Sequence, residues 1–191
     1  MVTTRNSRAD VVAAAGRLFA EKGYHGTSMR VLGRELGLLG SSLYAHVESK
    51  QDLLVAVVEE GARLFQESAQ TALAVEGSGS DRLRALVTGH VDVVLANQDI
   101  VRTFLNEARM LDEEHRARVI AARDVYEQAF RQVVADGVRD GSFRGDVDPK
   151  VVSIFTLSIL NALQRWYRPD GELDRDGLVD AILAFALTGI A

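Results

Sequence analysis

The sequence predicts an all-α protein with a small N-terminal bundle, a larger C-terminal helical domain and about nine helices in all. Apolar residues make up 47% of the 191 residues, and only 2 are Pro, a composition typical of a helix-rich globular protein. Apolar positions recur at spacings of three and four along most of the chain, and no segment shows sustained strand alternation. Both observations favour helices throughout.

The first two helices are predicted from short amphipathic segments separated by glycines. Residues 10–22 place apolar side chains on one face, and Gly23 ends this helix. Thr27 is the expected N-cap of the second helix, and Gly37 is the expected positive-φ residue of the turn after it. The second helix has an expected buried face of Met29, Leu32, Gly33 and Leu36.

A third short helix and a long fourth helix complete the N-terminal part. Leu43 and Val47 anchor the third helix, while Ser49 and Asp52 form the S-x-x-D capping box that starts the fourth, which is expected to run to about residue 72. Two short helices joined at a glycine turn form a helix-turn-helix, whose second helix fits the DNA major groove. We therefore expect residues 1–48 to be a DNA-binding domain and residues 49–191 a second domain.

The rest of the chain is expected to form helices over 81–96, 98–110, 113–140, 148–168 and 174–190, separated by Asn, Gly and Pro. Residues 151–166 and 178–190 are apolar on nearly all sides. Such a helix lies at the centre of a core or is buried against a partner. Because DNA sites read by such helices are two-fold, we expect these two helices to form a homodimer interface.

Composition and motifs exclude several other classes of protein. The chain has no Cys, so disulfides, thiol catalysis and thiolate metal sites are excluded. Asp112 and His115 are spaced like half of a helical-bundle metal site, but the run DEEHR is interpreted as solvated charge. Phosphate-binding and nucleophile motifs do not occur, so no enzyme activity, cofactor or metal is expected. The lack of a signal-peptide pattern or of a run of about 20 apolar residues predicts a cytoplasmic protein.

Charge is distributed unevenly along the chain. The net charge is −5, but residues 1–50 carry seven Lys or Arg against four Asp or Glu, a net of +3. The remaining residues carry a net of −8. A basic end on an acidic body would face DNA while the body stays away from the phosphates.

The run GYHGTSMRVLGRELGL followed by SSLYAHVESKQDLL resembles the N-terminal domain of TetR-type transcriptional regulators. The resemblance covers about residues 8–58 and implies a homodimeric, all-helical repressor with a ligand-binding and dimerisation domain. It also implies binding to a palindromic double-stranded DNA operator and release by a small-molecule effector. A later segment, NALQRWYRPDG at 161–171, is similar to regulators of fatty-acid, sterol and aromatic-acid breakdown, several of which respond to acyl-CoA thioesters. An acyl-CoA or another hydrophobic acid derivative is therefore the effector class that this similarity favours.

The resemblance assigns DNA contacts to residues of the helix-turn-helix and of the fourth helix. The second helix and the residues before it contribute Thr27, Ser28 and Arg30. The expected recognition helix contributes Ser41, Ser42, Tyr44 and His46, and Lys50 is expected to bind a phosphate. These hydroxyl, guanidinium and ammonium groups are donors that suit phosphate oxygens or a guanine edge.

Candidate effector contacts in the second domain are aromatic and basic side chains. They are Phe65, Phe104, Arg109, Tyr126, Phe130, Arg165 and Trp166. Each aromatic residue could equally belong to an ordinary core, and each arginine to the surface. Two alternatives for the whole chain also stay open: a helical ligand-binding or enzymatic domain with a vestigial DNA reader, and a constitutive DNA-binding protein without effector release.

Overall fold

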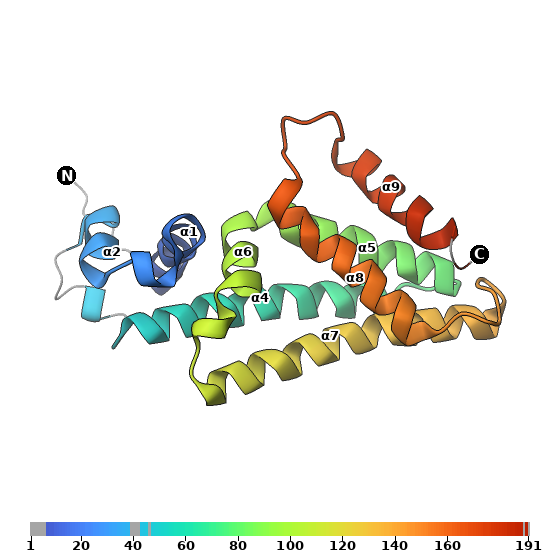
Figure 1. Ribbon diagram of the computed structural model, residues 1–191, viewed down its shortest axis with the longest axis horizontal. Coiled ribbons are helices and arrows are strands. Elements are labelled where there is room, and N and C mark those ends of the chain that lie inside the picture. The colour runs from blue at the N-terminus through green and yellow to red at the C-terminus, as the bar shows by residue number, and fades with distance from the viewer. Residues whose placement is uncertain (1–6, 39–42, 46, 189, 191) are drawn as a thin grey trace. The chain divides into compact units, whose positions relative to one another are not determined.

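The computed structural model describes residues 7–38, 43–45, 47–188 and 190. Within these residues the regular secondary structure is all helical, and no strand is present (Figure 1). The α-helices are α1 (Arg8–Gly26), α2 (Met29–Glu35), α4 (Lys50–Leu73), α5 (Gly79–Ala96), α6 (Gln98–Asn106), α7 (Glu113–Asp140), α8 (Pro149–Trp166) and α9 (Arg175–Thr188), with a 3₁₀ turn η1 (Ala108–Met110) after α6. The predicted all-α fold class is confirmed.

The chain divides into two compact units. Unit 1 comprises Met1–Ala62 and Asp99–Ile120, and unit 2 comprises Arg63–Gln98 and Ala121–Ala191. The helices α4 and α7 each contribute one part to each unit. Each unit groups residues that lie close together in space and combines two stretches of the chain. The units therefore neither confirm nor contradict the expected domain boundary at residue 48.

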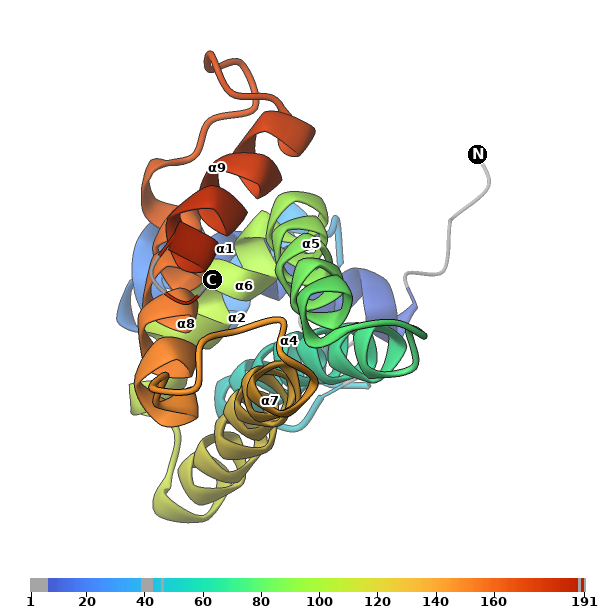
Figure 2. The same cartoon turned by 90° about the vertical axis from the view of Figure 1, so that its right-hand side faces the viewer.

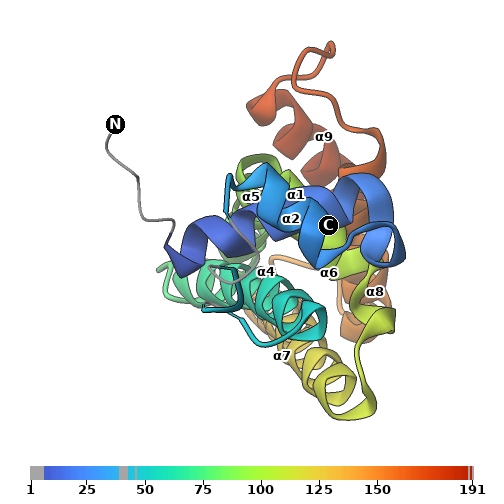
Figure 3. The same ribbon diagram turned by 90° about the vertical axis from the view of Figure 1, so that its left-hand side faces the viewer.

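Unit 1 is built around α1, which packs against α2 (Figure 3). The α1 helix begins at a capping box in which Ser7 and Asp10 bond each other's backbone N–H groups, at 3.2 and 2.7 Å. Gly23 has φ +72° and interrupts the helical dihedrals, as the sequence predicts for this break. The buried apolar face of α1 comprises Val11, Ala14, Ala15, Leu18 and Phe19.

In unit 2, α9 lies beside α5 and α8 (Figures 1 and 2). The guanidinium of Arg175 makes two parallel bonds to the Asp92 carboxylate, at 2.7 and 2.8 Å, and Arg84 pairs with Asp180 at 3.0 Å. Fully buried leucines from three helices fill the space between them: Leu83 and Leu86, Leu160 and Leu163, and Leu178 and Leu183. The ion pairs therefore fix the edge of an apolar helix contact.

The start of α5 approaches the end of α7 closely because both positions are glycine. A Cβ at Gly79 would collide with the backbone of Gly137, and a Cβ at Gly137 would collide with the Phe143 ring. The N–H of Gly79 also donates to the Asp140 carboxylate at 2.7 Å. Packing and one charge-assisted hydrogen bond thus hold the two helix ends together.

One predicted helix is shorter than expected. The segment predicted as a helix over 98–110 ends at Asn106 and continues as η1. No Gly or Pro marks this end. Instead, the Glu107 carboxylate accepts from the Tyr24 N–H at 3.1 Å, and the Met110 carbonyl accepts from the Gln51 amide at 3.3 Å. Contacts distant in sequence, rather than local breakers, accompany the change in helix type.

Candidate DNA-binding surface and effector site

The turn after α2 is a Schellman motif. Gly37 has φ +64°, its N–H donates to the Arg34 carbonyl at 3.2 Å, and the Leu38 N–H donates to the Gly33 carbonyl at 2.8 Å. A Cβ at Gly33 would lie 3.1 Å from the Leu38 carbonyl oxygen, so the backbone of the turn passes close to α2 at this glycine. The predicted glycine turn is confirmed, and it supplies the break that a helix-turn-helix requires.

The predicted N-cap of α2 is wrong by one residue. Ser28 is the N-cap and accepts from the Val31 N–H at 3.3 Å. Thr27 is buried, and its hydroxyl donates to the carbonyls of Leu18 and Gly23 at 3.1 and 3.0 Å. Thr27 therefore closes the end of α1, because its hydroxyl bonds one carbonyl of the helix and the carbonyl of Gly23 at the break. This side chain is not placed to contact DNA.

The outward face of the helix-turn-helix carries polar side chains in its described part. Ser28 and Arg30 are exposed, and Tyr44 is 54% exposed. Leu43 is fully buried and Val47 nearly so, as predicted for the anchors of the third helix. The predicted contact residues Ser41, Ser42 and His46 lie outside the described residues.

Lys50 joins the start of α4 to the end of α1. Its Nζ donates to the carbonyls of Tyr24 and Thr27 at 2.9 and 3.0 Å and lies 4.1 Å from the centre of the Tyr24 ring. An ammonium group has three N–H donors, and two of them are used in these bonds within the protein. The sequence predicted a phosphate contact for Lys50 but not these bonds to the end of α1.

Tyr24 is the centre of a polar network within unit 1. Its hydroxyl donates to the Gln51 side-chain oxygen at 2.8 Å, and its N–H donates to the Glu107 carboxylate. Partial burial raises the pKa of its phenol, so the hydroxyl stays a donor at neutral pH. The network connects the end of α1 with the start of α4 and with η1.

Three of the predicted effector-contact residues meet in unit 2. Phe65 on α4 lies 5.3 Å from Tyr126 on α7, and Tyr126 lies 5.5 Å from Phe130, measured between ring centres. A fourth ring, His90 on α5, lies 4.7 Å from Phe65. All four side chains are buried. We call these four residues the aromatic cluster.

His90 is the polar member of the aromatic cluster. Its Nδ1 lies 3.1 Å from the Tyr126 hydroxyl, and its Nε2 has no hydrogen-bond partner among the described residues. Burial lowers the pKa of His90 to about 3, although the backbone of Leu160 partly opposes the shift. Burial also raises the pKa of Tyr126. Both groups are therefore uncharged at neutral pH.

The other four predicted effector contacts do not belong to the aromatic cluster. Phe104 and Arg109 belong to unit 1, where Phe104 packs on Gly61. Arg165 and Trp166 end α8 in unit 2; Arg165 is exposed, and Trp166 is 50% exposed. The Trp166 ring lies 6.3 Å from that of Tyr167.

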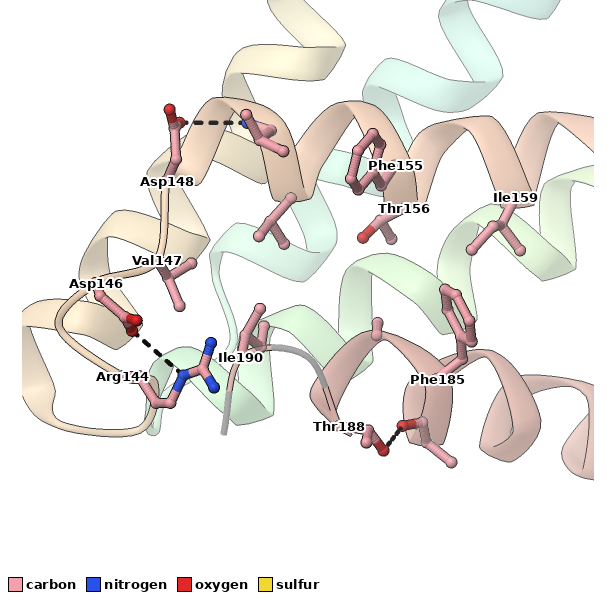
Figure 4. Close-up of a pocket in the computed structure, with 14 residues that line it drawn as sticks. Arg144, Asp146, Val147, Asp148, Phe155, Thr156, Ile159, Phe185, Thr188 and Ile190 are labelled. Atoms are coloured by element: carbon pink, nitrogen blue, oxygen red, sulfur yellow. Dashed lines mark hydrogen bonds and ion pairs between the residues drawn. The ribbon is translucent and has the colours of Figure 1, made fainter.

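An apolar groove of about 810 Å³ opens between α8 and the end of α9. Figure 4 shows Phe155 and Ile159 of α8 and Phe185 of α9 facing this opening, with the Arg144–Asp146 ion pair at one end. Phe155 is 64% exposed and Phe185 68% exposed. Large exposed aromatic side chains on one surface are typical of a protein–protein interface. We call this surface the α8–α9 groove.

Neither a group of metal-binding side chains nor a membrane-spanning helix is found among the described residues. No group of three His, Cys, Asp or Glu side chains there could hold a metal ion. His115 and Asp112 instead form a local pair at the start of α7, at 2.7 Å. None of the helices searched combines the length and the apolar character needed to cross a bilayer.

Two family models match this chain. The model for the N-terminal domain of bacterial regulatory proteins of the tetR family matches residues 11–57, and the model for the tetracyclin repressor-like C-terminal domain matches residues 76–190. The chain belongs to the TetR family. The first match covers the helix-turn-helix, the Schellman turn and the start of α4, and the second covers the helices of unit 2 that carry the α8–α9 groove.

Individual TetR-family relatives extend the same similarity over nearly the whole chain. The transcriptional repressor KstR2 of Rhodococcus jostii is 30% identical over 96% of this chain and 91% of its own length. The regulator PfmR of Thermus thermophilus has a TM-score of 0.86 at 31% identity, covering 93% and 97% of the two chains. AibR, solved with isovaleryl coenzyme A and operator DNA, has a TM-score of 0.86 at 26% identity, covering 94% and 97%. KstR2 and PfmR are named as a transcriptional repressor and a transcriptional regulator.

His90 belongs to the aromatic cluster of this TetR-family chain but was not among the predicted effector contacts. His90 shares its helical spacing with Leu83, Leu86, Val87 and Val94, which the structure buries with it on α5. A histidine at a core position of a predicted ligand-binding domain was the observation that could have singled it out.

Proposed function

We propose that this protein is a transcriptional repressor that binds a palindromic operator as a homodimer and is released by a small-molecule effector. The observation that carries the proposal is the Schellman-turn helix-turn-helix with Arg30 and Tyr44 exposed on it, in a chain of the TetR family. Two recognition helices related by a two-fold axis would enter major grooves about 34–36 Å apart. A protein of this kind acts in the cytoplasm, where the DNA is, and needs no enzymatic activity.

The proposed DNA contacts follow from donor chemistry and exposure. Arg30 can bond a guanine edge with two N–H groups, and Tyr44 and Ser28 can donate to phosphate oxygens. Lys50 supplies one remaining N–H at the start of α4, where the helix dipole also attracts an anion. Ser41, Ser42 and His46 stay in the proposed set through the family resemblance, and Thr27 is removed from it.

The proposed dimer interface is the α8–α9 groove. Exposed aromatic side chains on the last two helices would lose contact with water on pairing, and burial of apolar area stabilises association by about 25 cal/mol per Å² before the costs of binding are subtracted. A two-fold interface buries the same surface on both protomers. This arrangement supports a homodimer in which residues 1–48 read DNA and residues 49–191 bind the partner and the effector.

The proposed effector is an acyl-CoA or another hydrophobic acid derivative, bound in unit 2. AibR was solved with isovaleryl coenzyme A, and the aromatic cluster supplies buried apolar surface in this chain. Binding would release DNA by favouring a dimer whose recognition helices no longer match successive grooves. A coupling free energy of about 1–3 kcal/mol changes operator occupancy substantially.

Selection of DNA from a random duplex pool, followed by gel-shift titration, tests the proposal. The wild-type protein is expected to enrich a palindrome and to bind it roughly a thousandfold more tightly than random DNA at physiological salt. Arg30→Ala and Tyr44→Phe are expected to reduce this preference, whereas Arg139→Ala, at an exposed position on α7, serves as the matched control. Equal affinity for all duplexes would refute operator reading. Operator binding that no small molecule weakens would favour a constitutive DNA-binding protein.

A further inference from the structure

A groove of about 550 Å³ lies between α4 and α7 within unit 2. Four glutamine side chains contribute to its lining, along with small and apolar residues. They are Gln66 and Gln70 on α4 and Gln128 and Gln132 on α7. Asp124 is the one charged side chain among the described lining residues. We call this opening the glutamine groove; its lining offers neutral amide donors and acceptors and one negative charge.

The glutamine groove ends on the aromatic cluster. Tyr126 belongs to its lining and is 8% exposed, while its hydroxyl points inward to His90 Nδ1 at 3.1 Å. His90 is only 1% exposed, and its Nε2 has no hydrogen bond among the described residues. A buried polar atom without a partner is costly and calls for an explanation. A rotation of Tyr126 would connect the groove with His90, so a ligand group could satisfy the imidazole.

The charges around His90 and Tyr126 favour an uncharged ligand group over a carboxylate. His90 is neutral because burial holds its pKa at about 3, and Tyr126 is neutral because burial raises its pKa. A carboxylate placed there would lie near Asp124 and would be desolvated without a cation in the groove lining. Arg123, one turn before Tyr126, does not line the groove. An uncharged carbonyl or hydroxyl needs only a hydrogen bond, which Tyr126 or His90 can supply.

We propose that Tyr126 and His90 form the polar end of the effector site and select an effector whose buried group is an uncharged carbonyl or hydroxyl rather than a free carboxylate. This proposal rests on the proposed effector-released repressor. It sharpens the effector class to acids masked as thioesters, esters or amides and to neutral alcohols or ketones. The glutamine amides suit a polar, uncharged connecting chain that follows the masked group out of the groove.

Matched ligand pairs test the selection without knowledge of the natural effector. The free acid and its N-acetylcysteamine thioester are compared for a straight-chain acid (decanoic), an aromatic acid (phenylacetic) and a steroid acid (cholanic), by calorimetry on the full-length protein. For at least one skeleton the thioester is expected to bind about tenfold or more tightly than the acid, since the unpaired carboxylate keeps its desolvation cost. Free acids that bind as tightly as their thioesters would overturn the proposal. Such a result would indicate that a cation such as Arg123 contacts the carboxylate. No binding by any pair would also overturn it.

Substitutions of Tyr126 and His90 test whether these two residues cause the preference for thioesters over free acids. Tyr126→Phe removes one oxygen at constant shape and is expected to reduce thioester affinity severalfold, with little change for the acid. His90→Phe is expected to do the same, and His90→Gln, which restores a neutral hydrogen-bonding group, to recover part of the affinity. Gln164→Ala, on α8 outside the groove lining, is the control. Unchanged thioester preference in both Phe variants, with folding verified by circular dichroism, would overturn the assignment.

Operator binding, measured on the same preparations, separates this proposal from the proposed function. A wild-type protein that binds its operator but shows no thioester preference disproves the selection by Tyr126 and His90 alone. A wild-type protein that shows the preference but reads no operator disproves the repressor function and leaves the selectivity of the site standing.

Discussion

At the scale of single residues, Lys50 shows how one side chain serves the fold and the proposed DNA contact together. Its ammonium group bonds two carbonyls at the end of α1, which fixes the helix-turn-helix against the start of α4. The positive charge stays at the N-terminus of α4, where an anion is favoured. Removing this side chain should therefore change both stability and DNA binding.

Lys50→Gln is expected to lower the free energy of unfolding by about 1 kcal/mol, because the charge-assisted bonds to Tyr24 and Thr27 are lost. It is also expected to reduce the slope of log affinity against log salt by about 1 if the third N–H binds a phosphate. Urea unfolding and gel shifts at several salt concentrations measure the two effects. Lys150→Gln, at an exposed position of α8, is the control. A lower stability with an unchanged salt slope would limit Lys50 to a structural role.

Residue types and their spacing predicted which positions matter here, but not always which backbone group each side chain bonds. Thr27 and Ser28 are both good N-cap residues by type. Thr27 instead closes α1, because the break at Gly23 leaves carbonyls within its reach, and Ser28 caps α2. A one-residue choice of this kind depends on where the chain turns, which the sequence pattern does not specify.

At the scale of helices, the ends that local chemistry defines were predictable. Gly37, Pro149 and the cap at Ser49 mark ends by residue type, and the structure places helix ends at them. The cap at Ser78 starts α5 at Gly79, two residues before the expected start at 81. The end of α6 was not predictable, because the contacts there come from Tyr24 and Gln51, distant in sequence. Likewise, His90 and Tyr126 are 36 residues apart, so their pairing required the fold.

The contact between the start of α5 and the end of α7 should make the fold sensitive to acid. Hydrogen bonds from the hydroxyl and N–H of Ser142 and from the N–H of Gly79 hold the pKa of Asp140 below its ordinary value of 3.8. A lowered folded-state pKa means that this stabilisation is present above about pH 4 and is lost as the pH falls through the folded-state pKa.

Asp140→Asn is therefore expected to lower stability at neutral pH and to flatten the fall in unfolding free energy below about pH 4. Urea unfolding between neutral and acidic pH measures this dependence, with Asp170→Asn, at an exposed position after α8, as the control. If the unfolding free energy of the variant fell below about pH 4 as steeply as that of the wild-type protein, Asp140 would not stabilise the contact between the two helix ends.

At the scale of the whole molecule, the chain exposes on α8 and α9 the apolar surface that a core would normally bury. The sequence identified these helices as too apolar for a surface, and Phe155 and Phe185 are indeed exposed in the single chain. A monomer would leave this surface in water at a cost, whereas a two-fold pair removes it from water in both copies. In the proposed repressor, recognition of two half-sites depends on the same pairing.

Phe155→Glu places a charge in the α8–α9 groove and is expected to convert the proposed dimer to a monomer at micromolar concentration. Because Phe155 is 64% exposed in the single chain, the helical circular dichroism spectrum should be retained. Operator affinity should fall at least about a hundredfold, since each half-site would then bind alone. Light scattering and gel shifts measure the two effects, with Val75→Glu, an exposed apolar position after α4, as the control. A Phe155→Glu protein that remains dimeric would place the interface elsewhere and would separate operator reading from the α8–α9 groove.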